Sequence, residues 1–363
     1  MSLRSPIVYL CASLFLAGCA DELAPDTTTP LMPTAAVKAP KQGELGVMSY
    51  NLYVGADLDQ VIGALVNADP ADDFPALLNA IDVLGQTDYP SRVEAIADAI
   101  AAARPDVVGL QEVWTIAIDL RPYGVPVAID LDFQALLQDA LAARGLNYAA
   151  AASVQNTDAG PFPGIRVVDH DVILVDQDRV TVTGTTGRNF AANIGPVAPG
   201  ISLLRGYVAI EATIAGRSYT FVNAHLESGK SAAITGLRAL QATELVSVIG
   251  SAPTVVLMGD LNDVPGSPMH QVLTAGGLVD AWSALRPGAR GLTCCHAPDL
   301  SNAQSTFDQR IDYVFGRGLD QAGRQLKGQI EIVGDQAKDR IDGPFHAIWP
   351  SDHAGLTVTL SAP

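Results

Sequence analysis

The stretch VVLMGDLNDVPGSP, residues 255–268, places Asp260 and Asn262 directly after a run of apolar residues. Side chains at positions i and i+2 of an extended segment project to the same side, so the two polar groups can converge on one object beyond a strand's end. That object could be a metal ion, a water molecule or a phosphate. Asp and Asn are also common turn residues, and a structural turn explains this stretch equally well when it is taken alone.

Polar side chains also end the other extended runs of the chain. These ends carry Asn51, Glu112, His225, the pair Asp260 and Asn262, Asp312, and the pair Asp352 and His353. Neighbouring strand ends lie side by side in a layered sheet, which would gather these oxygen ligands and two imidazoles in one place. Oxygen-rich sets suit Mg²⁺ or Mn²⁺ better than zinc, and such ions bind phosphate oxygens. The pattern therefore predicts phosphoryl chemistry.

The elements that would position these residues are both helical and extended. Strands are predicted at 45–51, 107–112, 171–175, 206–214, 218–225, 254–259, 311–315 and 355–360, with a hairpin turn at 215–217. Helices are predicted from a capping box at Ser91–Glu94 up to Pro105, over 132–143, and within 229–249, the last with Leu237, Leu240, Leu245 and Val248 on its apolar face. The Pro- and Asp-containing stretch 55–90 is predicted to be an insertion, either a lid or a specificity loop. The fold class is mixed α/β.

The composition is globular and acidic. The 363 residues are 48% hydrophobic and carry a formal net charge of −17. This charge disfavours tight, charge-driven capture of duplex nucleic acid, although a nuclease that offsets the repulsion with metal ions stays possible. We expect a monomer.

The first residues have the layout of an export signal. Arg4 precedes an apolar run at 7–17, which is too short to span a bilayer, and the run ends at Leu16-Ala17-Gly18-Cys19, a sequence similar to a bacterial lipobox. We therefore predict a signal peptide over 1–18, a lipid anchor on Cys19 and a flexible tether over 19–43. An ordinary cleaved signal is the alternative. In either case the domain, 44–363, is exported, either anchored to a membrane or secreted.

Export also bears on the remaining cysteines. Cys294 and Cys295 are adjacent. In an oxidising compartment they could form a vicinal disulfide, or they could remain two thiols on opposite sides of an extended segment. Neither arrangement has the spacing of a zinc site.

The motifs SYNLYVG, GLQEVW, NAHLES, GDLNDVP, RIDYVF and SDHAG, taken together and in this order, resemble the endonuclease/exonuclease/phosphatase superfamily. Deoxyribonuclease I, exonuclease-type repair enzymes, inositol phosphatases and bacterial sphingomyelinases share its fold. The resemblance extends over residues 44–363 and implies a four-layer αββα sandwich with two packed mixed sheets. It implies that the enzyme is a phosphodiesterase that depends on Mg²⁺, or on Mn²⁺ or Ca²⁺.

The resemblance also implies a role for each strand-end residue. Glu112 would be the principal metal ligand, and Asn51 and Asp352 would complete the metal site. Asp260 and Asn262 would position the attacking water or a phosphate oxygen. His353, oriented by Asp312, would act as acid or base or stabilise developing charge, and His225 would contact the phosphate from the other side.

The sequence leaves the phosphate ester open between nucleic acid, as for a secreted nuclease, and a phospholipid head group, as for a sphingomyelinase or phospholipase C-like enzyme. A non-catalytic binding lipoprotein is the contrasting alternative. His270, His296 and His346 are interpreted as packing or surface residues, and His170, next to Asp171 at the entry of a strand, could support the site. Arg310 could contact a phosphate or form a structural ion pair.

Overall fold

A computed structural model describes residues 38–361 of the chain, except for 42, 68, 70, 161 and 320–325. The predicted signal peptide 1–18, Cys19 and most of the tether lie outside the described residues.

Two mixed sheets form the centre of the domain. The ten-stranded sheet contains β1 (Glu44–Asn51), β2 (Val107–Gln111), β3 (Thr115–Asp119), β4 (Ala128–Asp132), β5 (Tyr148–Ala159), β6 (Ile165–Asp176), β8 (Gly195–Ala198), β9 (Ile201–Leu203), β15 (Gly328–Val333) and β18 (Gly355–Ser361). The six-stranded sheet contains β7 (Val180–Asn189), β10 (Gly206–Ile214), β11 (Arg217–His225), β12 (Val255–Asp260), β13 (Val279–Asp280) and β14 (Asp312–Arg317). A separate pair joins β16 (Ile341–Asp342) to β17 (Ala347–Ile348). The strands predicted from the sequence are all present.

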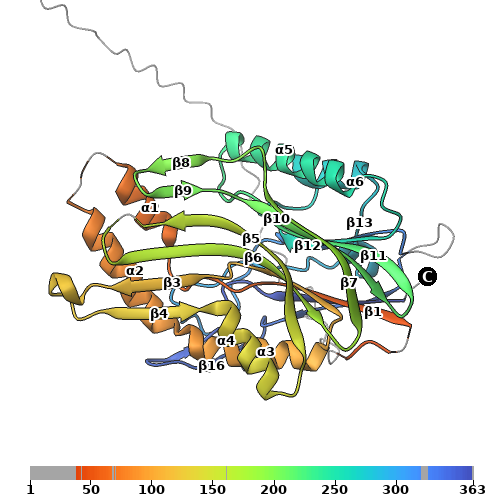
Figure 1. The fold of residues 1–363 in the computed structure, drawn as a ribbon, viewed down its shortest axis with the longest axis horizontal. Helices are drawn as coiled ribbons and strands as arrows, with labels where there is room; N and C mark the ends of the chain where they lie inside the picture. The colour runs from red at the N-terminus through yellow and green to blue at the C-terminus, as the bar shows by residue number, and fades with distance from the viewer. Residues whose placement is uncertain are drawn as a thin grey trace, which may run out of the picture. The chain divides into compact units, whose positions relative to one another are not determined.

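Helices cover the outer face of each sheet (Figure 1). The ten-stranded sheet carries α1 (Leu58–Val66), α2 (Asp73–Thr87), α3 (Tyr89–Ala103) and α4 (Phe133–Ala143). The six-stranded sheet carries α5 (Ala232–Ile249) and α6 (Pro268–Ala275), and the short α7 (Ala281–Leu285) follows β13. Short 3₁₀ helices span Arg121–Tyr123 and Ala337–Asp339.

Successive side chains of the central strands contribute to two different hydrophobic cores. Val107 packs between the two sheets, against residues such as Val208 and Val256, whereas Val108 faces the helices α2–α4. Successive side chains of a strand point to opposite faces, so one buried strand can serve two cores. The result is the four-layer αββα sandwich that the family resemblance implies.

Two details of the predicted helices are wrong. The N-cap of α3 is Asp88, whose carboxylate accepts a hydrogen bond from the Ser91 backbone N–H, so the helix begins two residues before the predicted capping box. In α5, Leu240 and Val248 are exposed, and the buried side includes Arg238 and Gln241. Helix α5 is long and apolar enough to cross a membrane, but Leu245 and other residues of it pack onto the six-stranded sheet.

The predicted insertion 55–90 is mainly helical rather than a loop. It forms α1 and α2, and Leu77, Ile81 and Leu84 of α2 join the core beneath the ten-stranded sheet. The segment is therefore packed onto the domain, close to the end of β1.

Arg92 of α3 ties together two chain segments that lead into the strand-end cluster. Its guanidinium is fully buried and donates to the carbonyl oxygens of Leu52, Tyr53 and Pro350 at 2.7, 2.9 and 3.0 Å. A fourth bond reaches the carbonyl of Thr87. The loop after β1 and the segment before Asp352 are thus held by one side chain.

Replacing Arg92 with methionine is expected to lower the free energy of unfolding by about 3 kcal/mol or more, because the buried carbonyls lose their donors. Urea unfolding followed by circular dichroism measures this change. Arg121→Met is the matched control: Arg121 pairs with Asp119 on the surface, and its loss should leave the midpoint near that of the wild type. Equal midpoints for the two variants would contradict the assigned role of Arg92.

Arg310 forms a buried structural pair rather than a phosphate contact. Its guanidinium binds both carboxylate oxygens of Asp280, at 3.0 and 2.7 Å, and both side chains are 4% exposed. His270 and Ser283 also contact this carboxylate. Burial raises the pKa of Asp280, but the bonds from His270, Arg310 and Ser283 outweigh it and hold that pKa well below its usual range.

Asp280 should therefore add stability that depends on pH. A carboxyl with a lowered folded-state pKa stabilises the fold fully above its unfolded pKa of about 3.9, and this contribution disappears as the pH falls toward the folded-state value. Asp280→Asn is expected to cost about 3–5 kcal/mol at pH 7, and the difference from wild type should shrink below about pH 4. Urea unfolding between pH 2.5 and 7 measures it, with the exposed Asp139→Asn as control. A difference that stays constant with pH would contradict the assignment.

Candidate active site

The six-stranded sheet aligns three of the predicted site residues. His225 of β11 is in register with Asp260 of the parallel β12, and Asp260 is in register with Asp312 of the antiparallel β14. The three side chains therefore lie in one row across adjacent strands, because paired positions on neighbouring strands are the closest points between them. All three are buried.

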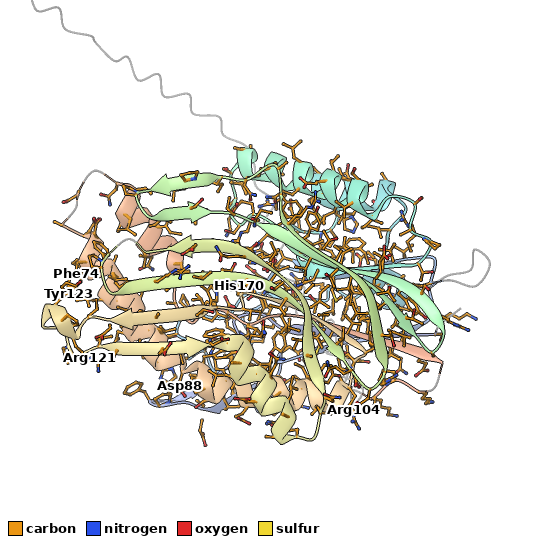
Figure 2. All side chains as sticks on the ribbon, in the orientation of Figure 1. Phe74, Asp88, Arg104, Arg121, Tyr123 and His170 are labelled. Carbon is orange, nitrogen blue, oxygen red and sulfur yellow. A yellow bond between two sulfur atoms is a disulfide. The ribbon has the colours of Figure 1, made fainter. Side chains whose placement is uncertain are left out.

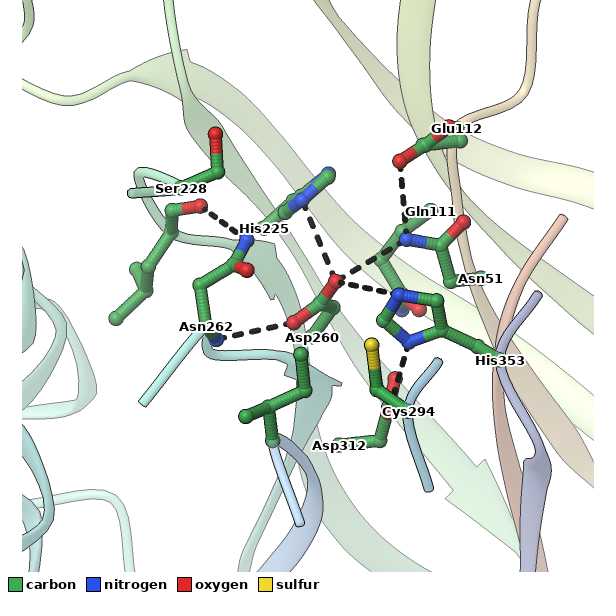
Figure 3. A network of polar contacts seen from close by, with 12 residues as sticks. Asn51, Gln111, Glu112, His225, Ser228, Asp260, Asn262, Cys294, Asp312 and His353 are labelled. Carbon is green, nitrogen blue, oxygen red and sulfur yellow. Dashed lines mark hydrogen bonds and ion pairs between the residues drawn. The ribbon is translucent and has the colours of Figure 1, made fainter. Parts of the chain in front are cut away.

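The ten-stranded sheet brings Asn51 and Glu112 to the same place. The parallel strands β1 and β2 pair Asn51 with Gln111, and Glu112 follows directly. The Asn51 amide nitrogen donates to Glu112 Oε1 at 3.2 Å and to Asp260 Oδ2 at 3.1 Å. Asn51 thus connects the polar ends of the two sheets (Figure 3).

Asp260 is the centre of the contacts in Figure 3. Its Oδ2 lies 3.5 Å from His225 Nε2 and 3.7 Å from His353 Nε2, and it accepts from Asn51. Its Oδ1 accepts from the Asn262 backbone N–H at 2.9 Å. Burial raises the pKa of Asp260 to about 7, with Asp312 adding to the shift and His353 opposing it. Near neutral pH, a group with this pKa can both hold and release a proton.

His353 and Asp312 form a carboxylate–imidazole pair. His353 Nδ1 lies 2.9 Å from Asp312 Oδ2, which leaves Nε2 facing Asp260. Burial lowers the pKa of His353, but Asp312, Asp352 and Asp260 together raise it well above the usual value for histidine. The imidazole is therefore held as a cation that donates from both nitrogens.

His225 is held as a neutral imidazole, in contrast to His353. Arg205 Nη1 lies 3.0 Å from His225 Nδ1, and because a guanidinium has no acceptor, Nδ1 must accept and the ring proton must be on Nε2. Burial lowers the pKa of His225 well below its usual value, with Arg205 and His353 acting in the same direction. His225 is thus a neutral donor that faces Asp260.

An uncommon backbone conformation sets the direction of two polar side chains, those of Glu112 and Asn262. Glu112 and Asn262 both have positive φ, 55° and 52°, which is uncommon for residues other than glycine. The Asn262 amide then donates to the Leu226 carbonyl at 3.0 Å, and Glu112 Oε2 accepts from the backbone N–H of Val54 at 2.9 Å. Sparsely populated backbone conformations of this kind are concentrated at functional sites.

The oxygen donors at this site suit a hard divalent ion. Asp352 Oδ1 is buried without a hydrogen-bond partner among the described residues, and burial, with Glu112 adding to it, raises the pKa of Asp352 to about 7. A cation near Glu112 and Asp352 would relieve this like-charge repulsion. Asp260, Asp312 and His353 also place ligand atoms within 4.8 Å of one another, although the Asp312–His353 hydrogen bond occupies part of that set.

The structure brings together seven of the eight predicted site residues around Asp260, Glu112 and His353, and Asn262 reaches the group through its backbone. Asn51 lies between two carboxylates, and its Oδ1 accepts from the Tyr53 N–H at 2.9 Å. Its amide nitrogen bridges the two carboxylates of Glu112 and Asp260.

Several residues of the site were not predicted from the sequence. Arg205 sets the tautomer of His225, and Gln111 and Asn223 join the two sheets through a 2.6 Å hydrogen bond. Asn223 lies in the motif NAHLES, two residues before His225, so the period of the strand could have indicated it. Arg205 lies directly before β10, and no pattern in the neighbouring sequence indicates its role.

Cys294 and Cys295 form the vicinal disulfide, one of the two predicted alternatives. Cys295 Sγ lies 3.9 Å from His353 Nε2. The pair therefore forms part of the wall around His353.

Three of the remaining histidines, His270, His296 and His346, have structural surroundings, as predicted. His296 stacks between Phe307 and Trp349, with ring centroids 4.1 and 4.0 Å away. His270 contacts Asp280, and His346 Nε2 lies 3.4 Å from the Asp299 carbonyl. His170 of β6 is half-buried, with Nδ1 3.3 Å from the Val113 carbonyl (Figure 2).

The chain is similar to known proteins in sequence and in fold. The sequence profile described as the Endonuclease/Exonuclease/phosphatase family matches residues 48–353. Over 293 residues the chain is 23% identical to tyrosyl-DNA phosphodiesterase 2 of Mus musculus, which covers 77% of this chain and 64% of that protein.

Solved structures share the fold. An endonuclease/exonuclease/phosphatase family protein from Bacteroides thetaiotaomicron superposes with a TM-score of 0.56 at 17% identity, covering 87% of this chain and 94% of the other. A mannosyl-6-phosphatase from Bacteroides thetaiotaomicron VPI-5482 gives 0.55 at 18% identity, covering 87% and 99%. A protein from Beutenbergia cavernae gives 0.56 at 22% identity, covering 88% and 72%.

The names of these similar proteins include a phosphodiesterase and a phosphatase. The profile match covers most of the chain and every predicted site residue. The chain belongs to the endonuclease/exonuclease/phosphatase family.

Proposed function

We propose that this protein is a divalent-metal-dependent hydrolase of phosphate diesters that uses water as the nucleophile. One observation carries the proposal: Asp260, with a pKa raised to about 7, is surrounded by the neutral donor His225, the cationic His353 and the Asn51 amide. A buried carboxylate of this kind can take a proton from water beside groups that stabilise negative charge.

Glu112 and Asp352 are the residues that would hold the metal ion, with Asn51 next to them. Mg²⁺ fits this oxygen-donor set, and Mn²⁺ or Ca²⁺ can substitute for it. When bound, the ion would neutralise phosphate charge and polarise the phosphorus centre.

The protein's own groups account for the proton transfers. As the water oxygen bonds to phosphorus, its proton passes to Asp260, and the bond from phosphorus to the leaving oxygen breaks. His353 donates from Nε2 to the negative charge that develops, while Asp312 fixes its ring. His225 donates from Nε2 on the other side of Asp260 because Arg205 holds the proton there.

A test with several phosphate esters identifies the class of substrate. The full chain would be incubated with Mg²⁺, Mn²⁺, Ca²⁺ or EDTA against plasmid DNA, RNA, sphingomyelin, glycerophospholipid, inositol phosphates and p-nitrophenyl phosphate. Hydrolysis of diesters that EDTA abolishes supports the proposal. Hydrolysis of the monoesters alone would replace it with a phosphatase function, and turnover of none would favour a binding protein.

We also propose that the enzyme works outside the cytoplasm, anchored through a lipid on Cys19. This rests on the sequence of residues 1–19. Metabolic labelling with a radioactive fatty acid, compared between the wild type and Cys19→Ser, tests it. Equal labelling of the two would contradict the anchor.

A further inference from the structure

A cavity of about 90 Å³ lies between the helices α1 and α2 and the end of the ten-stranded sheet. Its walls come from both helices, from the loop after β1 and from β3, β5, β6 and β9. Among the described residues that line it, Thr157 alone carries a hydroxyl, and the others are apolar apart from the indole N–H of Trp114. Protein cores contain few voids larger than a water molecule, so an apolar cavity of this size is a distinct feature.

The cavity borders the catalytic site through two shared residues. Val54 and Trp114 both line it, and both donate hydrogen bonds to Glu112 Oε2, Val54 through its backbone N–H at 2.9 Å and Trp114 through Nε1 at 3.4 Å. The same two residues therefore form the wall of the cavity and hold the carboxylate that we assign to the metal. A group attached to a phosphate at Glu112 would meet this wall first.

Part of the cavity's lining is accessible to solvent. Leu58 and Ile62 of α1 and Leu203 of β9 are half-buried, so its lining is partly accessible. Phe74 at the start of α2 is 42% exposed and adds apolar surface to the same helical pair (Figure 2). The net charge of −17 gives no general attraction for a polyanion.

We propose that this cavity is a substrate subsite that binds an alkyl chain esterified to the scissile phosphate. The inference rests on the proposed function and narrows its substrate class to phosphodiesters that carry an aliphatic chain. An apolar cavity of about 150 Å³ holds a benzene-sized ligand, so the present one accepts a short run of methylene groups. A longer chain would continue along the half-buried residues of α1 and β9.

Two 4-nitrophenyl alkyl phosphates, with methyl and octyl chains, test the proposal. The enzyme is the full chain carrying Cys19→Ser, so that no lipid of its own competes for the cavity. In both substrates water adds to phosphorus and p-nitrophenolate leaves, so only the chain differs. We expect kcat/KM for the octyl ester to exceed that for the methyl ester at least about tenfold, since burial of two methylene groups already gives this factor. Equal values would overturn the subsite.

A pair of variants on α2 separates the cavity from general hydrophobicity. Ala80 lines the cavity and is buried, whereas Asn79, the residue before it on the same helix, is exposed. Ala80→Phe should remove the preference for the octyl ester, while Asn79→Phe should keep it. Loss of the preference in both variants, or in neither, would overturn the proposal.

Failure of the inference can be told apart from failure of the proposed function. No metal-dependent turnover of either ester would contradict the function itself. Turnover of both at equal rates would contradict only the subsite. If Ala80→Phe does not fold, the comparison of the methyl and octyl esters, made without that variant, still tests the subsite.

Discussion

His353→Gln is expected to lower kcat by roughly 10²–10⁴-fold, the usual contribution of a positioned acid or base. Glutamine can still donate a hydrogen bond, but it cannot carry the positive charge that Asp312, Asp352 and Asp260 maintain on the imidazole. Initial rates with bis-(p-nitrophenyl) phosphate at saturating Mg²⁺ measure the effect.

His346→Gln is the matched control for this variant. His346 contacts the Asp299 carbonyl outside the site, so its replacement should leave kcat unchanged. Both variants should keep the circular dichroism spectrum of the wild type. A His353→Gln enzyme that retains more than about a tenth of wild-type kcat would remove His353 from the catalytic group.

Glu112→Gln should lower kcat/KM by roughly 10²–10³-fold, because it removes a charge from the metal-binding set while keeping the size of the side chain. Glutamine Oε1 can still accept from the Val54 N–H, so the loop after β1 should stay in place. The Mg²⁺ concentration for half-maximal rate should rise, and high Mg²⁺ should restore part of the activity.

Glu211→Gln serves as the control for charge alone, since Glu211 is exposed on β10. It should not change the Mg²⁺ dependence. The same Mg²⁺ requirement in Glu112→Gln and in the wild type would contradict the assignment of Glu112 as a metal ligand.

The sequence predicts which residues come together at this site because the site is built from strand ends. Residues His225, Asp260 and Asp312 become neighbours through strand pairing alone, and each ends or begins an apolar run that can be seen in the sequence. The four-layer architecture followed from the family resemblance. The buried strands also reveal themselves as continuous apolar runs, as expected for strands covered on both faces.

What the sequence does not reveal depends on contacts between distant segments. Strand β5 begins Tyr-Ala-Ala-Ala-Ala, which has no strand signature, and it is extended because it pairs with β6. Arg92 and Arg205 have ordinary sequence surroundings, and their roles arise only where α3 meets the loop after β1 and where the start of β10 meets β11. Stretch 55–90 has turn residues that suggest a loop, but packing onto the sheet makes it helical.

The most direct test of the proposed function is the rate of p-nitrophenolate release from bis-(p-nitrophenyl) phosphate by the full chain, measured in Mg²⁺, after addition of EDTA, and after Mg²⁺ is restored. We predict turnover that EDTA abolishes and that returns with the metal. Turnover that persists in EDTA would contradict a metal-dependent diesterase built around Asp260 and Glu112.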